Sequence, residues 1–141
     1  MIYGLEGLLL LLAGVEDIRK KKIHVVYIIA MGIVSLFGCF FREEYNWYGG
    51  LGGFLIGVCM LGISRISNEQ IGRGDGMVIA AIGLLCGMRN TLGIVCFASL
   101  FMVIPALFVI VCKKASKKTR LPFLPALFLG YVVTLLVGGS I

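Results

Sequence analysis

The chain has 141 residues, of which 60% are hydrophobic and only 14% are charged, and its mean hydropathy is +1.04. Typical soluble domains carry about a quarter charged residues, so this composition excludes a water-soluble protein and places the chain in a lipid bilayer. The net charge of +6 does not indicate nucleic-acid binding, because the basic residues form short clusters between apolar runs instead of one continuous soluble face.

Six apolar stretches separated by polar breaks predict an all-α, polytopic membrane protein, a bundle of six transmembrane helices in one domain over residues 1–141. In chain order the stretches are Ile2–Val15, Ile23–Phe41, Tyr48–Ile66, Gly76–Met88, Thr91–Cys112 and Pro122–Ile141. A helix needs about 20 residues to cross the apolar core of a bilayer. The first and fourth stretches are the shortest, and we expect a recessed, water-filled notch at their ends.

The lysines and arginines predict how this bundle is oriented. Cytoplasmic segments of membrane proteins retain positive charge. The polar segments at the ends of the first, third and fifth stretches contain four, two and five basic residues, whereas the opposite side has only Arg42 and Arg89. We therefore expect both termini to lie outside the cytoplasm.

Glycine accounts for 20 of the 141 residues, about twice its usual share. Gly49, Gly53 and Gly57 recur every four residues in the third stretch, and Gly83 and Gly87 do so in the fourth. Helices in lipid associate largely through close backbone approach at small residues. We expect these glycines to lie in helix–helix contacts.

Two aspartates lie where apolar stretches meet the expected cytoplasmic surface. Asp17 follows the first stretch, and Asp75 precedes the fourth at the end of a Gly-x-Gly-Asp element. Two crossings separate them in the chain, so both are expected on one side of the membrane. Two carboxylates within hydrogen-bonding reach share one proton. An aspartic peptidase uses such a pair: the ionised member deprotonates a water and the protonated member donates to the peptide carbonyl.

The residues around Asp75 form a predicted active-site loop, which consists of Gly72, Arg73, Gly74 and Gly76. Glycine lets another chain approach the backbone closely, and a substrate peptide is one candidate for that chain. A purely structural interpretation also fits, because an aspartate before an apolar helix can act as an N-cap, worth about 1 kcal/mol.

Asp17 has a structural alternative as well, an exposed ion pair with the basic residues that follow it, worth at most about 1 kcal/mol. Glu16 and Arg19 are candidate supporting residues, and Glu16 also competes with its neighbour Asp17 for the catalytic role. His24 is the only histidine, so no Ser/His/Asp or Cys/His nucleophile is available. The five cysteines stand singly without zinc-ligand spacing, and we expect neither a metal site nor a cofactor.

These elements resemble the type IV prepilin peptidase family, the Gly-x-Gly-Asp intramembrane aspartic peptidases. Asp17-Ile18-Arg19 before a basic run matches the place of one catalytic aspartate of the family, and Gly72-Arg73-Gly74-Asp75 matches the place of the other. The segment Leu121-Pro122-Phe123-Leu124-Pro125-Ala126 looks like the family's late Pro-Phe-x-Pro helix start. The resemblance covers nearly the whole chain.

Two positions depart from the family pattern. Ile23 is followed by His24 and Val25, where the family often continues with proline and asparagine, and Met77 stands where a lysine usually follows the second aspartate. These departures concern the preference for substrates more than the aspartate pair.

The resemblance implies a membrane-embedded aspartic endopeptidase that removes the basic leader of a type IV prepilin or pseudopilin at the cytoplasmic face of a prokaryotic plasma membrane. Its partners would be that substrate and membrane lipids, with no nucleic acid. Longer members carry an N-terminal cytoplasmic domain with Cys-x-x-Cys pairs and also methylate the new N-terminus. We expect the short form without that domain, and no methyltransferase activity.

Two non-enzymatic interpretations stay open, a small membrane transporter and a scaffold subunit held by its glycine-rich faces. An ion-coupled transporter usually needs ionisable residues near mid-membrane, and Glu6 is the only acidic residue well inside an apolar stretch. Both interpretations predict that Asp17→Asn and Asp75→Asn are tolerated.

Overall fold

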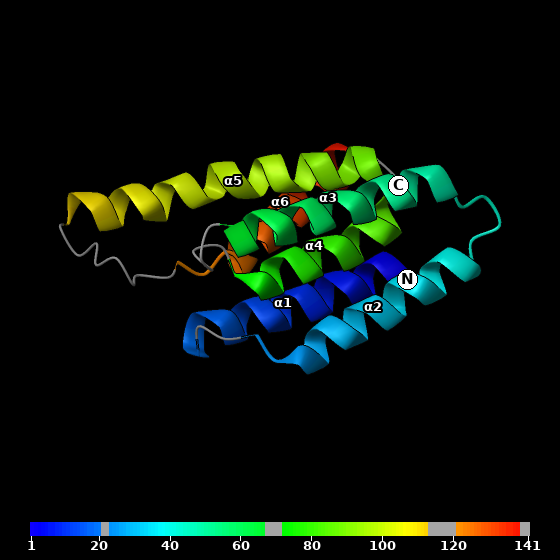
Figure 1. The fold of residues 1–141 in the computed structure, drawn as a ribbon, viewed down its shortest axis with the longest axis horizontal. Helices are drawn as coiled ribbons and strands as arrows, with labels where there is room; N and C mark the ends of the chain where they lie inside the picture. The colour runs from blue at the N-terminus through cyan, green and yellow to red at the C-terminus, as the bar shows by residue number, and fades with distance from the viewer. Residues whose placement is uncertain (21–22, 67–71, 113–120, 139–141) are drawn as a thin grey trace.

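A computed structural model describes residues 1–20, 23–66, 72–112 and 121–138 of the chain. These residues form helices and no strand, which confirms the all-α prediction (Figure 1). The six helices are α1 (Ile2–Lys20), α2 (Val25–Phe40), α3 (Trp47–Ile66), α4 (Arg73–Cys86), α5 (Met88–Val111) and α6 (Leu124–Val137).

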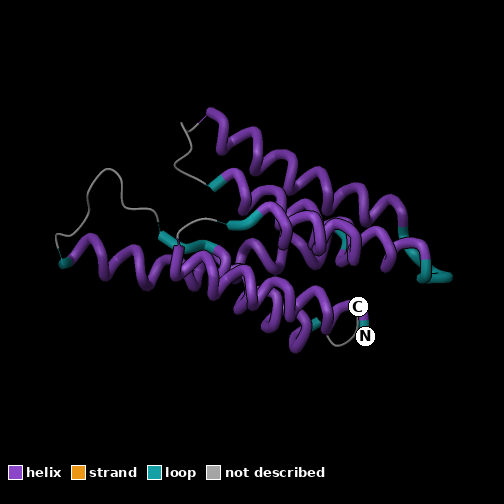
Figure 2. Tube along the Cα trace, turned by 90° about the horizontal axis from the view of Figure 1, so that it is seen from below, coloured by secondary structure: helices purple, strands orange, loops and turns teal. Residues whose placement is uncertain are grey.

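The helices run alternately up and down, so that each end of the bundle collects a defined set of termini (Figures 1 and 2). One end gathers the C-terminal ends of α1, α3 and α5 and the N-terminal ends of α2, α4 and α6. We call this the basic end, because the sequence places most lysines and arginines in the segments that join these termini. The opposite end holds the start of α1 and the end of α6.

Helix α4 lies at the centre of the bundle and packs against α2, α3 and α5. It is short and rich in small residues, and all but four of its 14 residues are buried. Since lipid is as apolar as the interior of the bundle, close packing is what stabilises such a helix. Because α4 is held by three neighbouring helices, the residues that it carries have fixed positions in the bundle.

Glycines allow α3 and α4 to approach until their backbones touch. A Cβ atom on Gly53 would overlap the carbonyl group of Gly83, and one on Gly57 would overlap the backbone of Ala80. The predicted packing role is confirmed for these glycines. Gly87 has a different role: it ends α4 with a φ of 82°, a left-handed conformation that favours glycine, and turns the chain into α5.

The helix lengths differ from the prediction. Helix α1 has 19 residues and continues past Asp17 to Lys20, so it is longer than α2 and α6, and the expectation that both aspartate-bearing helices are the shortest is wrong for α1. Basic side chains in its last turn stabilise the negative end of the helix dipole, and Lys20 pairs with Glu16 one turn earlier. Helix α4, at 14 residues, is short as expected.

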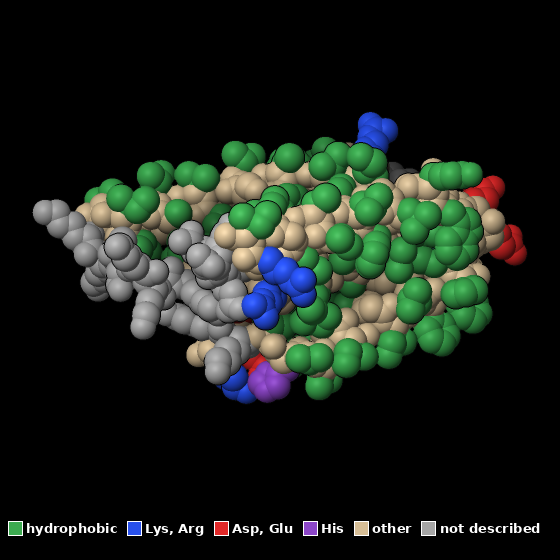
Figure 3. Space-filling model, viewed as in Figure 1, with side chains coloured by type: hydrophobic (Ala, Val, Ile, Leu, Met, Phe, Trp, Pro, Cys, Tyr) green, Lys and Arg blue, Asp and Glu red, His purple; other side chains and the backbone are tan. Residues whose placement is uncertain are grey.

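Among the residues that the structure describes, two helices, α3 and α5, are long and apolar enough to cross a membrane. Only 22% and 11% of the most apolar 18-residue segments of α3 and α5 are buried within the bundle, so most of their apolar side chains face outward. Figure 3 shows hydrophobic side chains over the outer faces of α2, α3 and α5, with charged side chains toward the two ends. A surface of this kind suits lipid.

Candidate active site

Asp17 and Asp75 lie together at the basic end of the bundle. Asp17 stands one turn before the end of α1, and Asp75 stands in the first turn of α4. Both side chains are buried, with exposed fractions of 8% and 7%. Both also lie outside the apolar stretches: the first stretch ends before Asp17, and the fourth begins after Asp75.

The two carboxylates are electrostatically coupled. Burial, together with the neighbouring Asp17 carboxylate, raises the pKa of Asp75 to about 7. A buried acid beside a second acid holds its proton because two adjacent negative charges repel each other in a medium of low polarity. Asp75 therefore keeps part of its protonation near neutral pH, and the two acids titrate as a coupled pair.

Asp75 is held by the start of its own helix. Gly72 is the N-cap residue of α4 and Asp75 is the third residue of the helix. The Asp75 N–H donates to the Gly72 carbonyl at 3.1 Å, and the Gly72 N–H donates to the Asp75 carboxylate. The Asp75 carboxylate therefore makes one half of a capping box, the bond from the N3 side chain to the N-cap N–H, whereas Gly72 has no side chain to make the other half. The prediction that Asp75 is itself the N-cap is therefore wrong by three positions, because α4 begins at Arg73.

The glycines around Asp75 serve close contacts within the protein. A Cβ on Gly72 would lie 2.9 Å from Asp75 Oδ2, and one on Gly74 would lie 2.6 Å from Ile23 Cδ1. One on Gly76 would lie 2.8 Å from Leu61 Cγ. The predicted loop is the first turn of a helix, and the segments that approach Gly74 and Gly76 belong to this chain. Arg73, the other member of the predicted loop, is exposed.

Asp17 is held by the last helix. Leu124 is the first residue of α6, and its backbone N–H donates to the Asp17 carboxylate. The first N–H groups of a helix have no partner within the helix, and they carry partial positive charge that favours an anion. Burial raises the pKa of Asp17, and the Leu124 N–H opposes that rise. The Pro-Phe-x-Pro segment thus contacts the aspartate pair through the backbone N–H of Leu124.

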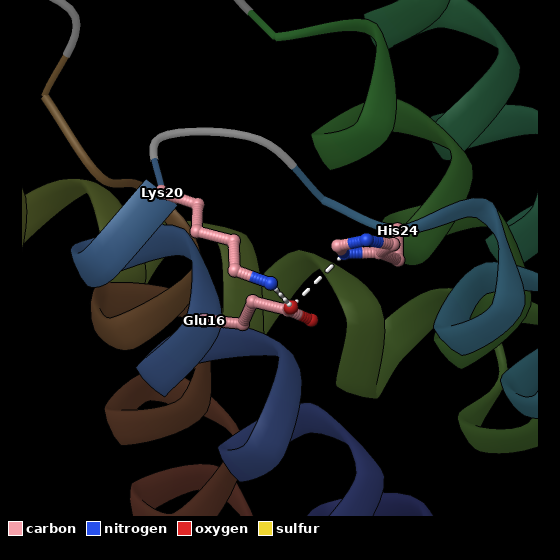
Figure 4. A network of polar contacts seen from close by, with 3 residues as sticks. All are labelled: Glu16, Lys20 and His24. Carbon is pink, nitrogen blue, oxygen red and sulfur yellow. Dashed lines mark hydrogen bonds and ion pairs between the residues drawn. The ribbon is translucent and has the colours of Figure 1, made fainter.

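Glu16 does not join this pair. Its Oε1 atom lies 2.9 Å from Lys20 Nζ and 2.9 Å from His24 Nδ1 (Figure 4). Adjacent residues of an α-helix point about 100° apart, so Asp17 faces the bundle while Glu16 faces the segment that leads to α2. Arg19 is exposed at the end of α1. Of the two acids at the end of α1, the structure brings Asp17 to Asp75.

The sequence contained no side-chain signal for the Leu124 donor, because the functional group is a main-chain N–H. The nearest signal was Pro125, since proline favours the first turn of a helix and so marks the start of α6. In the sequence, Glu6 stands out only as an acid inside an apolar stretch. In the structure it is fully buried and contacts Ser35 of α2.

Two comparisons with known proteins found similar sequences. Residues 5–107 match the sequence profile described as the Type IV leader peptidase family, a range that contains both aspartates. The chain is also 30% identical over 97 residues to the prepilin leader peptidase/N-methyltransferase of Bacillus subtilis (strain 168). The aligned part covers 68% of this chain and 39% of that relative. No solved structure matches the chain. Since the profile covers well over half of its length, the chain belongs to the type IV leader peptidase family.

Proposed function

We propose that this protein is a membrane-embedded aspartic endopeptidase that removes the basic leader peptide of type IV prepilins or pseudopilins. The observation that carries the proposal is the buried, electrostatically coupled pair Asp17 and Asp75 at the basic end of the bundle. Family membership and the similarity to a prepilin leader peptidase support the same substrate class.

The shared proton of the pair supplies the chemistry. The ionised carboxylate takes a proton from a water molecule, and the resulting hydroxide attacks the carbonyl carbon of the scissile peptide bond. The protonated carboxyl donates its proton to the carbonyl oxygen, so that a neutral tetrahedral intermediate forms without a covalent bond to the enzyme. The N–H groups of Gly72 and Leu124 hold the two carboxylates in place while their charge alternates.

The arrangement in the membrane forms part of the proposal. Residues 1–141 act as one membrane domain with six spans, the basic end lies in the cytoplasm, and both termini lie outside it. The alternating helix directions and the outward-facing apolar side chains of α3 and α5 support this arrangement. We place the protein in the plasma membrane of a prokaryote.

The same arrangement explains why a prepilin suits the site. The apolar helix of the substrate can pack against the bundle within the lipid, while its polar leader remains in the cytoplasm. The scissile bond then lies at the depth of Asp17 and Asp75. Methyl transfer to the new N-terminus is not part of the proposal.

Co-expression with a candidate prepilin from the same genome tests this function, with leader removal read on a gel. Asp17→Asn and Asp75→Asn should each abolish cleavage while the protein still inserts into the membrane, because both acids take part in proton transfer. Glu44→Gln is the matched control, since Glu44 is an exposed acid between α2 and α3 at the opposite end. Full cleavage by the Asp75→Asn variant would refute the mechanism, whereas no cleavage by the unmodified protein would favour a transporter or a scaffold.

A further inference from the structure

Glu6 is a second buried acid that the proposed reaction does not use. It lies on α1, toward the end of the bundle opposite the aspartate pair, and neither Glu6 nor Ser35 is exposed at all. Ser35 Oγ on α2 lies 2.9 Å from Glu6 Oε1 and 2.8 Å from the carbonyl oxygen of Ala81 on α4. One hydroxyl thus bridges three helices.

The number of available protons decides the state of Glu6. A serine hydroxyl has one proton to donate, yet Ser35 Oγ has two oxygen neighbours at hydrogen-bonding distance. The Ala81 carbonyl has no proton, so Ser35 must donate to it. Glu6 must then donate to Ser35, which requires a protonated carboxyl group. If Ser35 donated to Glu6 instead, two oxygen atoms would face each other at 2.8 Å without a proton between them.

The surroundings of Glu6 agree with a neutral side chain. Among the residues that the structure describes, no cation pairs with Glu6, and its Oε2 atom has no hydrogen-bond partner. The Arg42 guanidinium is bound to the Tyr3 hydroxyl instead, 5.4 Å from the centre of the Tyr3 ring. An unpaired carboxylate with an unbonded oxygen is costly inside a protein, whereas a neutral acid with one unbonded carbonyl oxygen costs far less.

The bridge connects the two helices that carry the aspartates. Glu6 and Asp17 are eleven residues apart on α1, which is about three turns or 16 Å, so they share one face of the helix. Ala81 follows Asp75 by six residues on α4, about 9 Å along its axis. Helix α1 packs chiefly against α2 and α6, and α4 packs against α2, α3 and α5. Since α2 contacts both α1 and α4, the bridge through Ser35 fixes their relative position.

We propose that Glu6 is a positioning residue, a neutral acid whose hydrogen bond to Ser35 holds α1 against α4 and thereby sets the separation of Asp17 and Asp75. This proposal rests on the proposed function for its catalytic consequence. The protonation of Glu6 and the spacing of the two aspartates can be measured without any substrate.

Four variants test it. Glu6→Gln keeps a neutral side chain that donates to Ser35, Glu6→Leu keeps a similar volume without a donor, and Ser35→Ala removes the bridging hydroxyl. Ser99→Ala is the matched control, because the Ser99 hydroxyl donates to the Val95 carbonyl within α5 at 2.8 Å and joins no two helices.

Infrared spectroscopy measures the protonation of Glu6 directly. In the Asp17→Asn/Asp75→Asn protein at neutral pH, we expect a carbonyl stretch of a protonated carboxylic acid that disappears when Glu6→Gln is added. The absence of this band in the parent protein would overturn the neutral-acid assignment. This measurement is independent of whether any prepilin is cleaved.

Titration of Asp75, followed with isotope-labelled aspartate, measures the spacing. Glu6→Leu and Ser35→Ala should move the Asp75 titration to lower pH, because Asp17 would lie farther away and repel the Asp75 anion less. Glu6→Gln and Ser99→Ala should leave it unchanged. If Glu6→Leu fails to fold, the Ser35→Ala variant alone tests the positioning role. An unchanged titration of Asp75 in a folded Ser35→Ala protein refutes that role.

Cleavage assays give the catalytic consequence. Glu6→Leu and Ser35→Ala should lower kcat about 10-fold to 100-fold, as small misplacements of reacting groups do, with KM unchanged. Glu6→Gln should restore the wild-type rate. Loss of folded protein with an unchanged kcat would show that Glu6 only stabilises the fold. A protein with the expected titration shifts that cleaves no prepilin refutes the proposed function and leaves the positioning role intact.

Discussion

The backbone N–H of Leu124 donates to the carboxylate of Asp17, which joins the last helix of the protein to the first at the aspartate pair. Asp75 receives an equivalent bond from the N–H of Gly72 at the start of α4. Each carboxylate is thus anchored by one main-chain donor at the start of a helix. These main-chain donors hold both buried carboxylates in a fixed orientation.

Removal of the Asp17 charge should lower the pKa of Asp75. Burial and Asp17 together raise that pKa to about 7, so Asp17→Asn should move it part of the way toward its ordinary value, while burial keeps it above that value. Titration of labelled aspartate measures the shift. Glu16→Gln is the matched control, because Glu16 pairs with Lys20 and His24. An equal shift in both variants would contradict the coupling.

Removal of the Leu124 N–H should raise the pKa of Asp17. A backbone ester at Leu124 keeps the buried side chain and deletes only the N–H that stabilises the Asp17 anion. Asp17 should then ionise at higher pH, so the acid limb of the pH–cleavage profile should move to higher pH. An ester at Leu129, in the interior of α6, should cost stability of about 1 kcal/mol without moving that limb. An unchanged acid limb in the Leu124 ester would count against the bond.

Substitution of Gly53 should separate α3 from α4. A Cβ atom there overlaps the Gly83 carbonyl group, and Gly53→Val should therefore lower the free energy of unfolding by about 2 kcal/mol or more. Gly62→Ala on the same helix is the control, because no atom lies within 4 Å of its added Cβ. It should be neutral or stabilising by up to about 1 kcal/mol, since alanine favours helix. Thermal unfolding in detergent compares the two.

Cysteine labelling should show the orientation and the depth of the site. In a protein without its native cysteines, a cysteine in place of the exposed Arg19 should react with a membrane-impermeant reagent only from the cytoplasmic side. A cysteine in place of the exposed Glu43 should react only from the other side. Cysteines at Asp17 and Asp75 should react from the cytoplasmic side more slowly than the one at position 19, because both positions are buried. Equal rates would argue against a recessed site.

Much of this protein could be predicted from local patterns. Apolar stretches between polar breaks predicted the helices, glycines at four-residue spacing predicted the contact of Gly53 and Gly57 with α4, and two crossings between Asp17 and Asp75 placed both acids at one end. The helix ends were less certain. Asp17 was expected to end α1 and Asp75 to cap α4, yet both lie within helices, because hydrophobicity marks the apolar core of a helix and not its first and last turns.

By itself, the sequence determined the helical class, the glycine contacts and the presence of the acids at one end of the bundle, because these follow from composition and from the spacing of residues along the chain. Only the tertiary structure decided that Asp17 and not Glu16 faces Asp75, that Leu124 supplies a donor, and that Ser35 links Glu6 to Ala81. These relationships depend on the rotation of each helix and on main-chain groups. Main-chain groups are the same in every residue except proline, so no side-chain pattern encodes the bonds that they make.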